Sequence, residues 1–102
     1  MKYRDLEAVR QLILEATGLD VSYYYEDLVF PEETVFIIQF DDHNLNNLFC
    51  HFQKDLKNQA RENVYKALAE VCQKQNISLE MKGLFELKEK DEKIDLVFLP
   101  LA

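Results

Sequence analysis

The first pattern along the chain is a helical repeat of apolar positions over residues 3–17. Leu6, Val9 and Ile13 are spaced three or four residues apart, so they share one face of a helix. Gly18 follows directly, and glycine commonly ends a helix because it adopts the left-handed conformation freely. The pattern predicts one helix that ends at residue 17.

The next segment changes to a repeat of two, which is typical of strands. Val21, Tyr23 and Tyr25 alternate with other side chains, as in a strand whose alternate residues face the core. Residues 30–33 are interpreted as a turn, because a proline fixes φ there. Residues 34–40 are apolar on both faces except at one glutamine, which predicts a central strand covered on both sides.

Residues 45–56 support two interpretations. The apolar positions lie on one helical face: Leu45, Leu48, Phe49, Phe52 and Leu56. The alternative is a strand over residues 47–52, because Asn, Cys, His and Phe are weak helix formers. Periodicity favours the helix. We expect a break near residues 56–58 before a second helix over residues 59–75, since one helix of about 32 residues would be roughly 48 Å long.

Strict alternation returns over residues 77–87, where apolar residues and a glycine occupy the odd positions. Only Leu84 interrupts the polar side of this strand. The charged run over residues 88–93 predicts a turn, and residues 94–99 form the last strand before Pro100.

The element order is therefore α-β-β-α-α-β-β, which predicts an α+β fold. We expect a single domain over residues 1–102, given the length of the chain. Adjacent strands should pair into a four-stranded antiparallel sheet, with a possible fifth strand at residues 47–52 and with helices packed on one face.

Composition and charge exclude several classes of function. The net charge of −7 argues against binding nucleic acid by phosphate neutralisation and against adhesion to an anionic membrane. No apolar run approaches the ~20 residues that span a bilayer, and the N-terminus lacks the features of a signal peptide. Cys50 and Cys72 are too few for the disulfide framework of a secreted protein, which leaves a single bridge between them as the alternative to free thiols. We therefore expect a cytoplasmic protein.

Motifs of enzymes and cofactor sites are missing from the sequence. Two glycines cannot form a phosphate-binding loop, and neither C-x-x-C nor H-E-x-x-H occurs. Asp41, Asp42 and His43 could gather a metal or move a proton, but helix capping beside a solvated histidine is the commoner role. Cys50 and His51 are adjacent and therefore point in different directions, so they do not form a thiolate–imidazole pair. We expect no catalytic site, no metal and no cofactor.

Acidic residues concentrate between Gln11 and Gln53, where no lysine or arginine occurs. This window holds eight acids and has a charge of −8, whereas the rest of the chain, with 11 acids and 12 bases, has +1. Carboxylates without nearby bases speed encounter with a basic partner, and tyrosine is enriched at interface hot spots. If the odd-numbered tyrosines face the core, Tyr24 faces outward. The predicted partner-binding site consists of Tyr24, Glu26, Asp27, Glu32, Glu33, Asp41 and Asp42. Alternatively, the tyrosines are ordinary sheet residues and the carboxylates a solvated surface.

The sequence favours a small non-catalytic module that binds a basic protein, of the immunity, inhibitor or secretion-chaperone kind. Its size, acidity and α+β layout resemble those of type III secretion chaperones, in element order and charge only, since no clear C-terminal helix is present. Two alternatives remain open. One is a homodimeric structural or assembly protein that buries residues 34–40 between two copies. The other is a small-molecule-binding domain or enzyme with an unrecognised site between helices and sheet.

Overall fold

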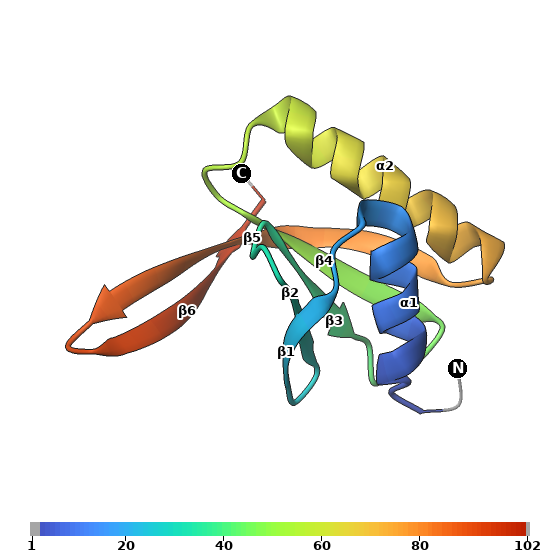
Figure 1. The fold of residues 1–102 in the computed structure, drawn as a ribbon, viewed down its shortest axis with the longest axis horizontal. Helices are drawn as coiled ribbons and strands as arrows, with labels where there is room; N and C mark the ends of the chain where they lie inside the picture. The colour runs from blue at the N-terminus through green and yellow to red at the C-terminus, as the bar shows by residue number, and fades with distance from the viewer. Residues whose placement is uncertain (1–2, 102) are drawn as a thin grey trace.

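The computed structural model describes residues 3–101, and within them it has two helices and six strands (Figure 1). The elements in chain order are α1 (Leu6–Thr17), β1 (Val21–Tyr25), β2 (Leu28–Pro31), β3 (Phe36–Phe40), β4 (Asn47–Gln53), α2 (Asn58–Lys74), β5 (Ser78–Lys90) and β6 (Lys93–Pro100). The strands form one sheet in the order β1-β2-β3-β4-β5-β6. Neighbours are antiparallel except β4 and β5, which are parallel because α2 crosses over between them.

Helix α1 begins and ends at residues that satisfy its free backbone groups. The Asp5 carboxylate accepts a hydrogen bond of 3.0 Å from the Ala8 N–H, and this cap fixes the N-terminus. Gly18 has φ of 76° and donates its N–H to the Leu14 carbonyl at 2.8 Å. The predicted helix is confirmed, although it begins at Leu6 rather than at residue 3.

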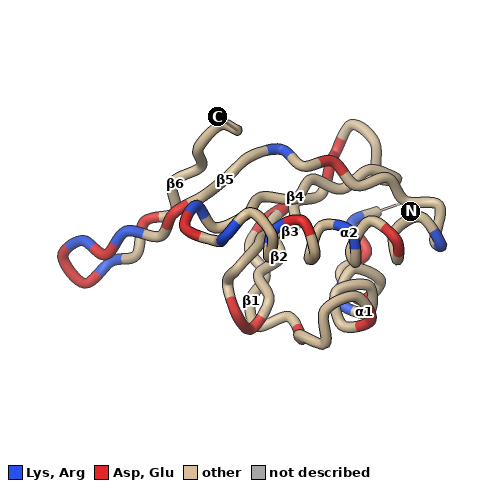
Figure 2. The backbone as a smooth tube through the Cα atoms, turned by 90° about the horizontal axis from the view of Figure 1, so that it is seen from above, with Lys and Arg blue, Asp and Glu red and all other residues tan. Residues whose placement is uncertain are grey.

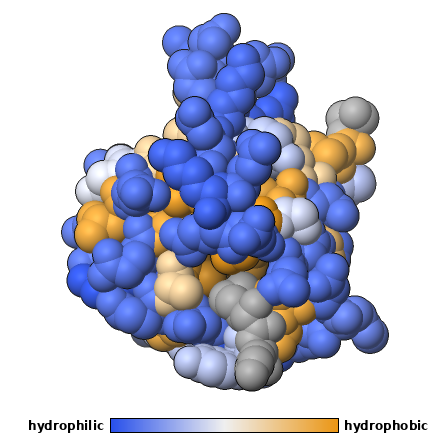
Figure 3. Space-filling view, turned by 90° about the vertical axis from the view of Figure 1, so that its right-hand side faces the viewer, coloured by the Kyte–Doolittle hydropathy of each residue, from blue (hydrophilic) through white to orange (hydrophobic). Residues whose placement is uncertain are grey.

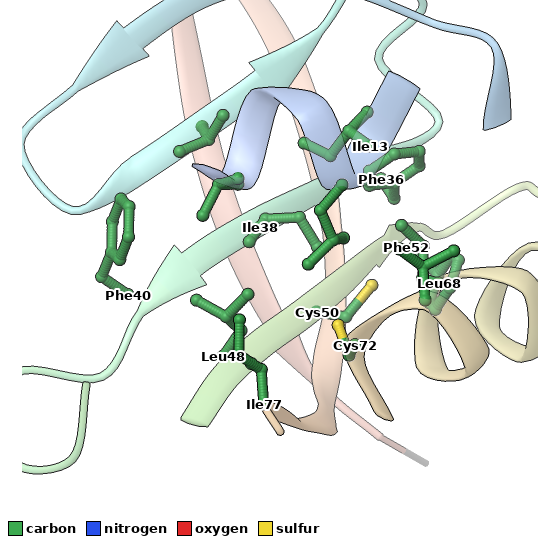
Figure 4. Packing of buried hydrophobic residues seen from close by; sticks show 14 residues of the cluster. Ile13, Phe36, Ile38, Phe40, Leu48, Cys50, Phe52, Leu68, Cys72 and Ile77 are labelled. Carbon is green, nitrogen blue, oxygen red and sulfur yellow. The ribbon is translucent and has the colours of Figure 1, made fainter. Parts of the chain in front are cut away.

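Both helices lie on one face of the sheet and enclose the core between the two layers (Figure 4). The helices contribute these fully or largely buried residues: Val9, Leu12, Ile13, Leu68, Val71 and Cys72. The sheet contributes alternate residues of its central strands: Val29, Phe36, Ile38, Phe40, Leu48, Cys50 and Phe52. The class α+β is therefore confirmed.

The predicted helix over residues 45–56 is wrong, and the alternative strand is correct. Leu48, Cys50 and Phe52 are buried at a spacing of two, and β4 lies between β3 and β5. Positions 48 and 52 fit both a helical and a strand period, so the apolar pattern alone did not separate them. The weak helix formers of this segment, together with pairing on both of its edges, favour the strand.

The first hairpin turns five residues earlier than predicted. Glu26 and Asp27 form the turn, with Glu26 at φ of 53°, and the chain returns as the additional strand β2. Pro31 ends β2 instead of beginning a turn, and β3 starts at Phe36 instead of residue 34. The central position of β3 is confirmed, because four of its five residues are buried between β2 and β4.

The sheet is six-stranded and mixed, so the predicted four-stranded antiparallel sheet is wrong in detail. A register shift between Cys50 and His51 opposes a bulge at Lys82. Leu79 and Met81 precede the bulge and pack against the helix-side core. After the bulge the even-numbered residues face the helices instead of the odd-numbered ones. Leu84 therefore joins that core, while residues 83 and 85 face away from the helices.

The face of the sheet opposite the helices has a small cluster of its own. Its centre consists of Ile37, His51 and Phe85, which are buried but do not belong to the helix-side cluster. Ile37 is paired with His51 across β3 and β4, and the His51 ring lies 4.5 Å from the Phe98 ring, centre to centre. We call this surface the helix-free face.

Within residues 3–101, neither helix combines the length and the apolar character that crossing a membrane requires.

Candidate functional site

Four of the predicted acidic residues lie together at one end of the sheet. Glu26 and Asp27 form the β1–β2 turn, and the Phe40 N–H donates to the Asp27 carbonyl at 2.9 Å. Asp41 and Asp42 follow Phe40 directly, so the β3–β4 loop starts beside this turn. Figure 2 shows the turn in red, without a neighbouring basic residue in the tube.

The other two predicted acids lie at the opposite end of β2. Glu32 and Glu33 follow the last residue of β2, and the Glu32 carboxylate accepts a hydrogen bond of 2.7 Å from the Asp20 N–H. The strand β2 separates them from the β1–β2 turn. The predicted site is therefore divided between two ends of the sheet.

Arginines from α1 and its N-terminal flank neutralise part of the acidic window. Arg4 forms a two-point ion pair with Asp42, with its Nε 2.8 Å from Oδ1, and lowers the pKa of this carboxyl. Arg10 contacts Asp20 with Nε–Oδ1 of 2.7 Å and lowers its pKa likewise. Both arginines precede residue 11, so a window free of bases in sequence is not free of bases in space.

Two carboxylates remain available for a partner at these ends. Among the described residues, Glu26 and Glu33 take part in no ion pair or side-chain hydrogen bond. Asp41 instead accepts from the Asn47 amide at 3.2 Å, which lowers its pKa. Glu26 stands at the acidic end of the sheet and Glu33 at the opposite end.

The tyrosines of β1 lie on the opposite faces of the sheet from those predicted, although Tyr24 is exposed, as expected. A bulge between Val21 and Tyr23 shifts the alternation, so Tyr24 shares the helix side with its partner Val29. Tyr23 and Tyr25 stand on the helix-free face. All three are exposed, at 58% for Tyr23, 39% for Tyr24 and 54% for Tyr25, because β1 is an edge strand. The expectation that Tyr23 and Tyr25 belong to the core is therefore wrong.

A chain of hydrogen bonds connects the acidic turn to the interior. The Gln39 amide nitrogen donates to Asp27 Oδ2 at 2.8 Å, and its oxygen lies 2.9 Å from His51 Nε2. Because the Gln39 oxygen only accepts, His51 carries its proton on Nε2. Burial lowers the pKa of His51 to about 4, and the nearby Lys82 charge acts in the same direction. His51 is therefore neutral at pH 7 and holds Gln39 in place to bind Asp27.

The sequence did not reveal these hydrogen bonds, because Asp27, Gln39 and His51 are each separated by twelve positions along the chain. The available signal was Gln39, which is the one polar residue in the otherwise apolar strand β3. His51 does not have the geometry of a general base. Its Nδ1 is buried without a hydrogen-bond partner among residues 3–101, on the side where a Cβ at Gly83 would lie 3.9 Å away.

The two cysteines are buried and free, and their side chains meet in the core (Figure 4). Burial raises the pKa of both thiols, that of Cys72 to about 11. They therefore remain protonated at neutral pH and are poor nucleophiles. Cys50 faces the helices whereas His51 faces away from them, so the prediction that these neighbours point in different directions is confirmed.

One cavity of about 370 Å³ opens between the C-terminal end of α1, the first half of α2 and the β2–β3 loop. Its walls are mainly aliphatic, with Leu19, Val35 and Val64 among them, and Glu33 is its one carboxylate. No histidine or cysteine lines it. Across the described part of the chain, no group of three His, Cys, Asp or Glu is placed to hold a metal ion.

Apolar surface is unevenly distributed over the molecule. Figure 3 views the end that carries the helices, and the surface at the top of this view, where α2 lies in Figure 1, is mostly hydrophilic. Apolar patches appear lower down in this view. Large exposed apolar side chains belong mainly to β1, β5 and β6: Tyr23, Tyr24, Tyr25, Leu87, Ile94 and Phe98.

Comparisons with protein-family models, with curated proteins and with solved structures found no match to this chain.

Proposed function

We propose that this protein is a non-catalytic interaction module that binds a basic protein through β1 and the β1–β2 turn. One observation carries the proposal. Tyr23 and Tyr25 stand exposed on an edge strand that runs directly into the acidic turn Glu26–Asp27. The tyrosines supply contact area and the turn supplies charge.

The two tyrosines have the character of interface anchors. Tyr23 packs against Phe30 with ring centres 5.8 Å apart, which holds its ring in place before a partner arrives. A pre-positioned ring loses little side-chain entropy on binding, so more of its contact energy contributes to affinity. The outer edge of β1 pairs with no strand among residues 3–101, so an extended segment of the partner has backbone groups to bond.

The charge at this end of the sheet favours a basic partner. Among residues 3–101, Glu26 takes part in no ion pair, and the side-chain partner of the Asp27 carboxylate is the neutral amide of Gln39 rather than a base. The protein as a whole has a net charge of −7, which adds a long-range attraction for basic proteins and repels nucleic acids and anionic membranes. Binding should therefore weaken as salt rises.

The proposed role requires no reaction and no cofactor, in the manner of an immunity protein, an inhibitor or a secretion chaperone. The proposal places the protein in the cytoplasm, where buried free cysteines such as Cys50 and Cys72 remain reduced. A dimer that buries β3 between two copies is less favoured. Both faces of β3 are already covered within one chain.

The test is to capture a partner from native lysate at low salt, identify and purify it, and measure its affinity by calorimetry. We expect Tyr25→Ala and Glu26→Lys each to weaken binding by roughly tenfold or more, because both residues are exposed at the proposed centre. Leu14→Ala and Glu62→Lys are controls at exposed positions of the two helices and should bind normally. Equal affinity in all four variants would refute the proposed site, and an acidic partner would refute the proposed charge recognition.

A further inference from the structure

The β5–β6 hairpin extends beyond the body of the protein as an arm. Its last contact with β4 is the pair Gln53–Phe85, and from Glu86 onward β5 pairs with β6 alone. Figure 1 shows this hairpin projecting away from both helices. We call residues 86–96 the arm. A two-stranded hairpin is at best marginally stable alone in water, so the arm gains stability if something pairs with it.

One side of the arm and of the adjoining part of β6 is mainly apolar, with Glu89 opposite Ile94 as its charged residue. Ile94, Leu96 and Phe98 alternate along β6 and share one face, with Leu87 of β5 directly opposite Leu96. Ile94 is 65% exposed and Phe98 43% exposed. The outer edge of β6 has no strand partner among the described residues. A long edge strand with exposed apolar side chains is an association site rather than a neutral surface.

The charges of the arm indicate what associates with it. Residues 86–96 contain five acids and three lysines, and Figure 2 shows both signs interspersed along the arm. The three lysines disfavour the basic partner proposed for β1, and the five acids disfavour an acidic one. The apolar part of β6 is matched by a second copy of the same strand, because antiparallel self-pairing about Leu96 brings Ile94 onto Phe98 and places no two like charges opposite one another.

We infer that β6 pairs antiparallel with β6 of a second copy, so that two copies form one continuous sheet about a two-fold axis at Leu96. In a symmetric antiparallel pair, the residue on the two-fold axis opposes itself, and residues equally far from the axis oppose one another on the same face of the sheet. The residue on the axis therefore defines the register. With the axis at Leu96, Ile94 of each copy meets Phe98 of the other. This register places the whole apolar row in contact, and aromatic–β-branched pairs stabilise sheets.

The neighbouring registers are less favourable for identifiable reasons. An axis at Asp95 places two carboxylates directly opposite one another, which is destabilising. An axis at Val97 brings Pro100 opposite Ile94, and proline has no N–H for the ladder. An axis at Ile94 leaves only residues 93–95 of the two β6 strands overlapping. The axis at Leu96 avoids all three defects.

The dimer is independent of the function proposed for β1. The two β1 strands would lie at the outer ends of the joined sheet, because β1 and β6 are its opposite edges. Each copy would therefore keep its tyrosines and acidic turn free for a partner, and the dimer would present that site twice.

The first experiment is analytical ultracentrifugation of the full chain over a wide range of concentration. We expect the wild-type protein to sediment as a dimer. Ile94→Lys should raise the dimer dissociation constant by roughly tenfold or more, because two Ile94–Phe98 contacts are lost per dimer. The control Leu14→Lys makes the same kind of change at an exposed leucine of α1 and should remain dimeric. Circular dichroism of each variant verifies that it folds.

The second experiment tests the register by mild oxidation of variants that each add one cysteine to β6. Leu96→Cys should form an intermolecular disulfide, because Leu96 is the one residue that opposes itself. Val97→Cys opposes Asp95 and should not cross-link, except when mixed with Asp95→Cys. Both native cysteines are buried, which keeps the background low.

Three results would overturn the inference. A wild-type protein that remains monomeric at every concentration removes the dimer. A dimer that survives Ile94→Lys unchanged moves the interface elsewhere. Cross-linking through Val97→Cys alone, without Leu96→Cys, shows a different register.

Discussion

We expect the buried histidine His51 to make the stability of this protein depend on pH between 7 and 5. The residue is 5% exposed, its ring lies against Phe98, and its Nε2 bonds the Gln39 oxygen, so a proton on Nδ1 would bring an uncompensated charge into the interior. Its pKa is lowered from the ordinary 6.5 to about 4 in the folded protein. The unfolded chain therefore binds this proton more readily than the folded one.

The sign and size of the effect follow from proton linkage. Above pH 6.5 the histidine is neutral in both states and its stabilising contribution is complete. As pH falls toward 4, only the unfolded state takes up the proton, so the free energy of unfolding decreases by about 1.4 kcal/mol for each pH unit. From pH 7 to pH 5 the loss amounts to about 2 kcal/mol, which shifts a urea midpoint by about 1 M for a small domain.

The assay is urea unfolding at pH 7 and pH 5, with His51→Gln as the test variant. Glutamine does not titrate and retains an N–H donor for Gln39, so the variant should lose most of the difference between the two pH values. His43→Gln is the matched control, because His43 is exposed, and it should keep the wild-type difference. The reasoning fails if His51→Gln shows the same pH dependence as the wild-type protein, whatever its absolute stability.

Two further predictions concern stability at neutral pH. Gly83→Ala should lower the free energy of unfolding by roughly 1–3 kcal/mol, because the added Cβ would lie 2.5 Å from the Leu99 carbonyl oxygen. Gly18→Ala should lower it by about 1 kcal/mol, because the residue has φ of 76° and not because of any contact. Urea unfolding compares the two, and Gly18→Asn should be more stable than Gly18→Ala, whereas Gly83→Asn should be no more stable than Gly83→Ala. Tyr65→Phe should lower the melting temperature by several degrees, because it removes the 2.9 Å hydrogen bond from the Tyr65 hydroxyl to the Leu79 carbonyl, and such a bond contributes about 1 kcal/mol. An unchanged melting temperature in calorimetry would show that water replaces this bond fully.

The sequence by itself determined the local elements whose signals lie within a few neighbouring residues. The apolar repeat that ends at Gly18 predicts α1, because capping and a left-handed glycine act within one turn of helix. Residues 34–40 are apolar on both sides, which places this strand in the middle of the sheet. Adjacent side chains point in different directions in a helix and in a strand alike. The different directions of Cys50 and His51 were therefore predictable without knowing which of the two forms.

Only the tertiary structure decided which face each side chain of β1 and β5 occupies. The bulges near Ser22 and at Lys82 each insert one residue, and one residue is enough to move all following side chains to the other face. Bulges arise from the pairing of two strands, so the sequence of one strand does not reveal them. The exposed positions of Tyr23 and Tyr25 follow from this displacement and from the place of β1 at the edge.

Pairing across the fold also decided the identity of β4 and the charge of the acidic window. Residues 47–53 carry an apolar pattern that fits two periods, and two neighbouring strands select the extended one by satisfying its backbone on both edges. Arg4 reaches Asp42 across 38 positions of sequence, so a charge count along the chain overstates the free negative charge. Local propensity acts over a few residues, whereas strand partners and ion pairs depend on which distant segments meet in space.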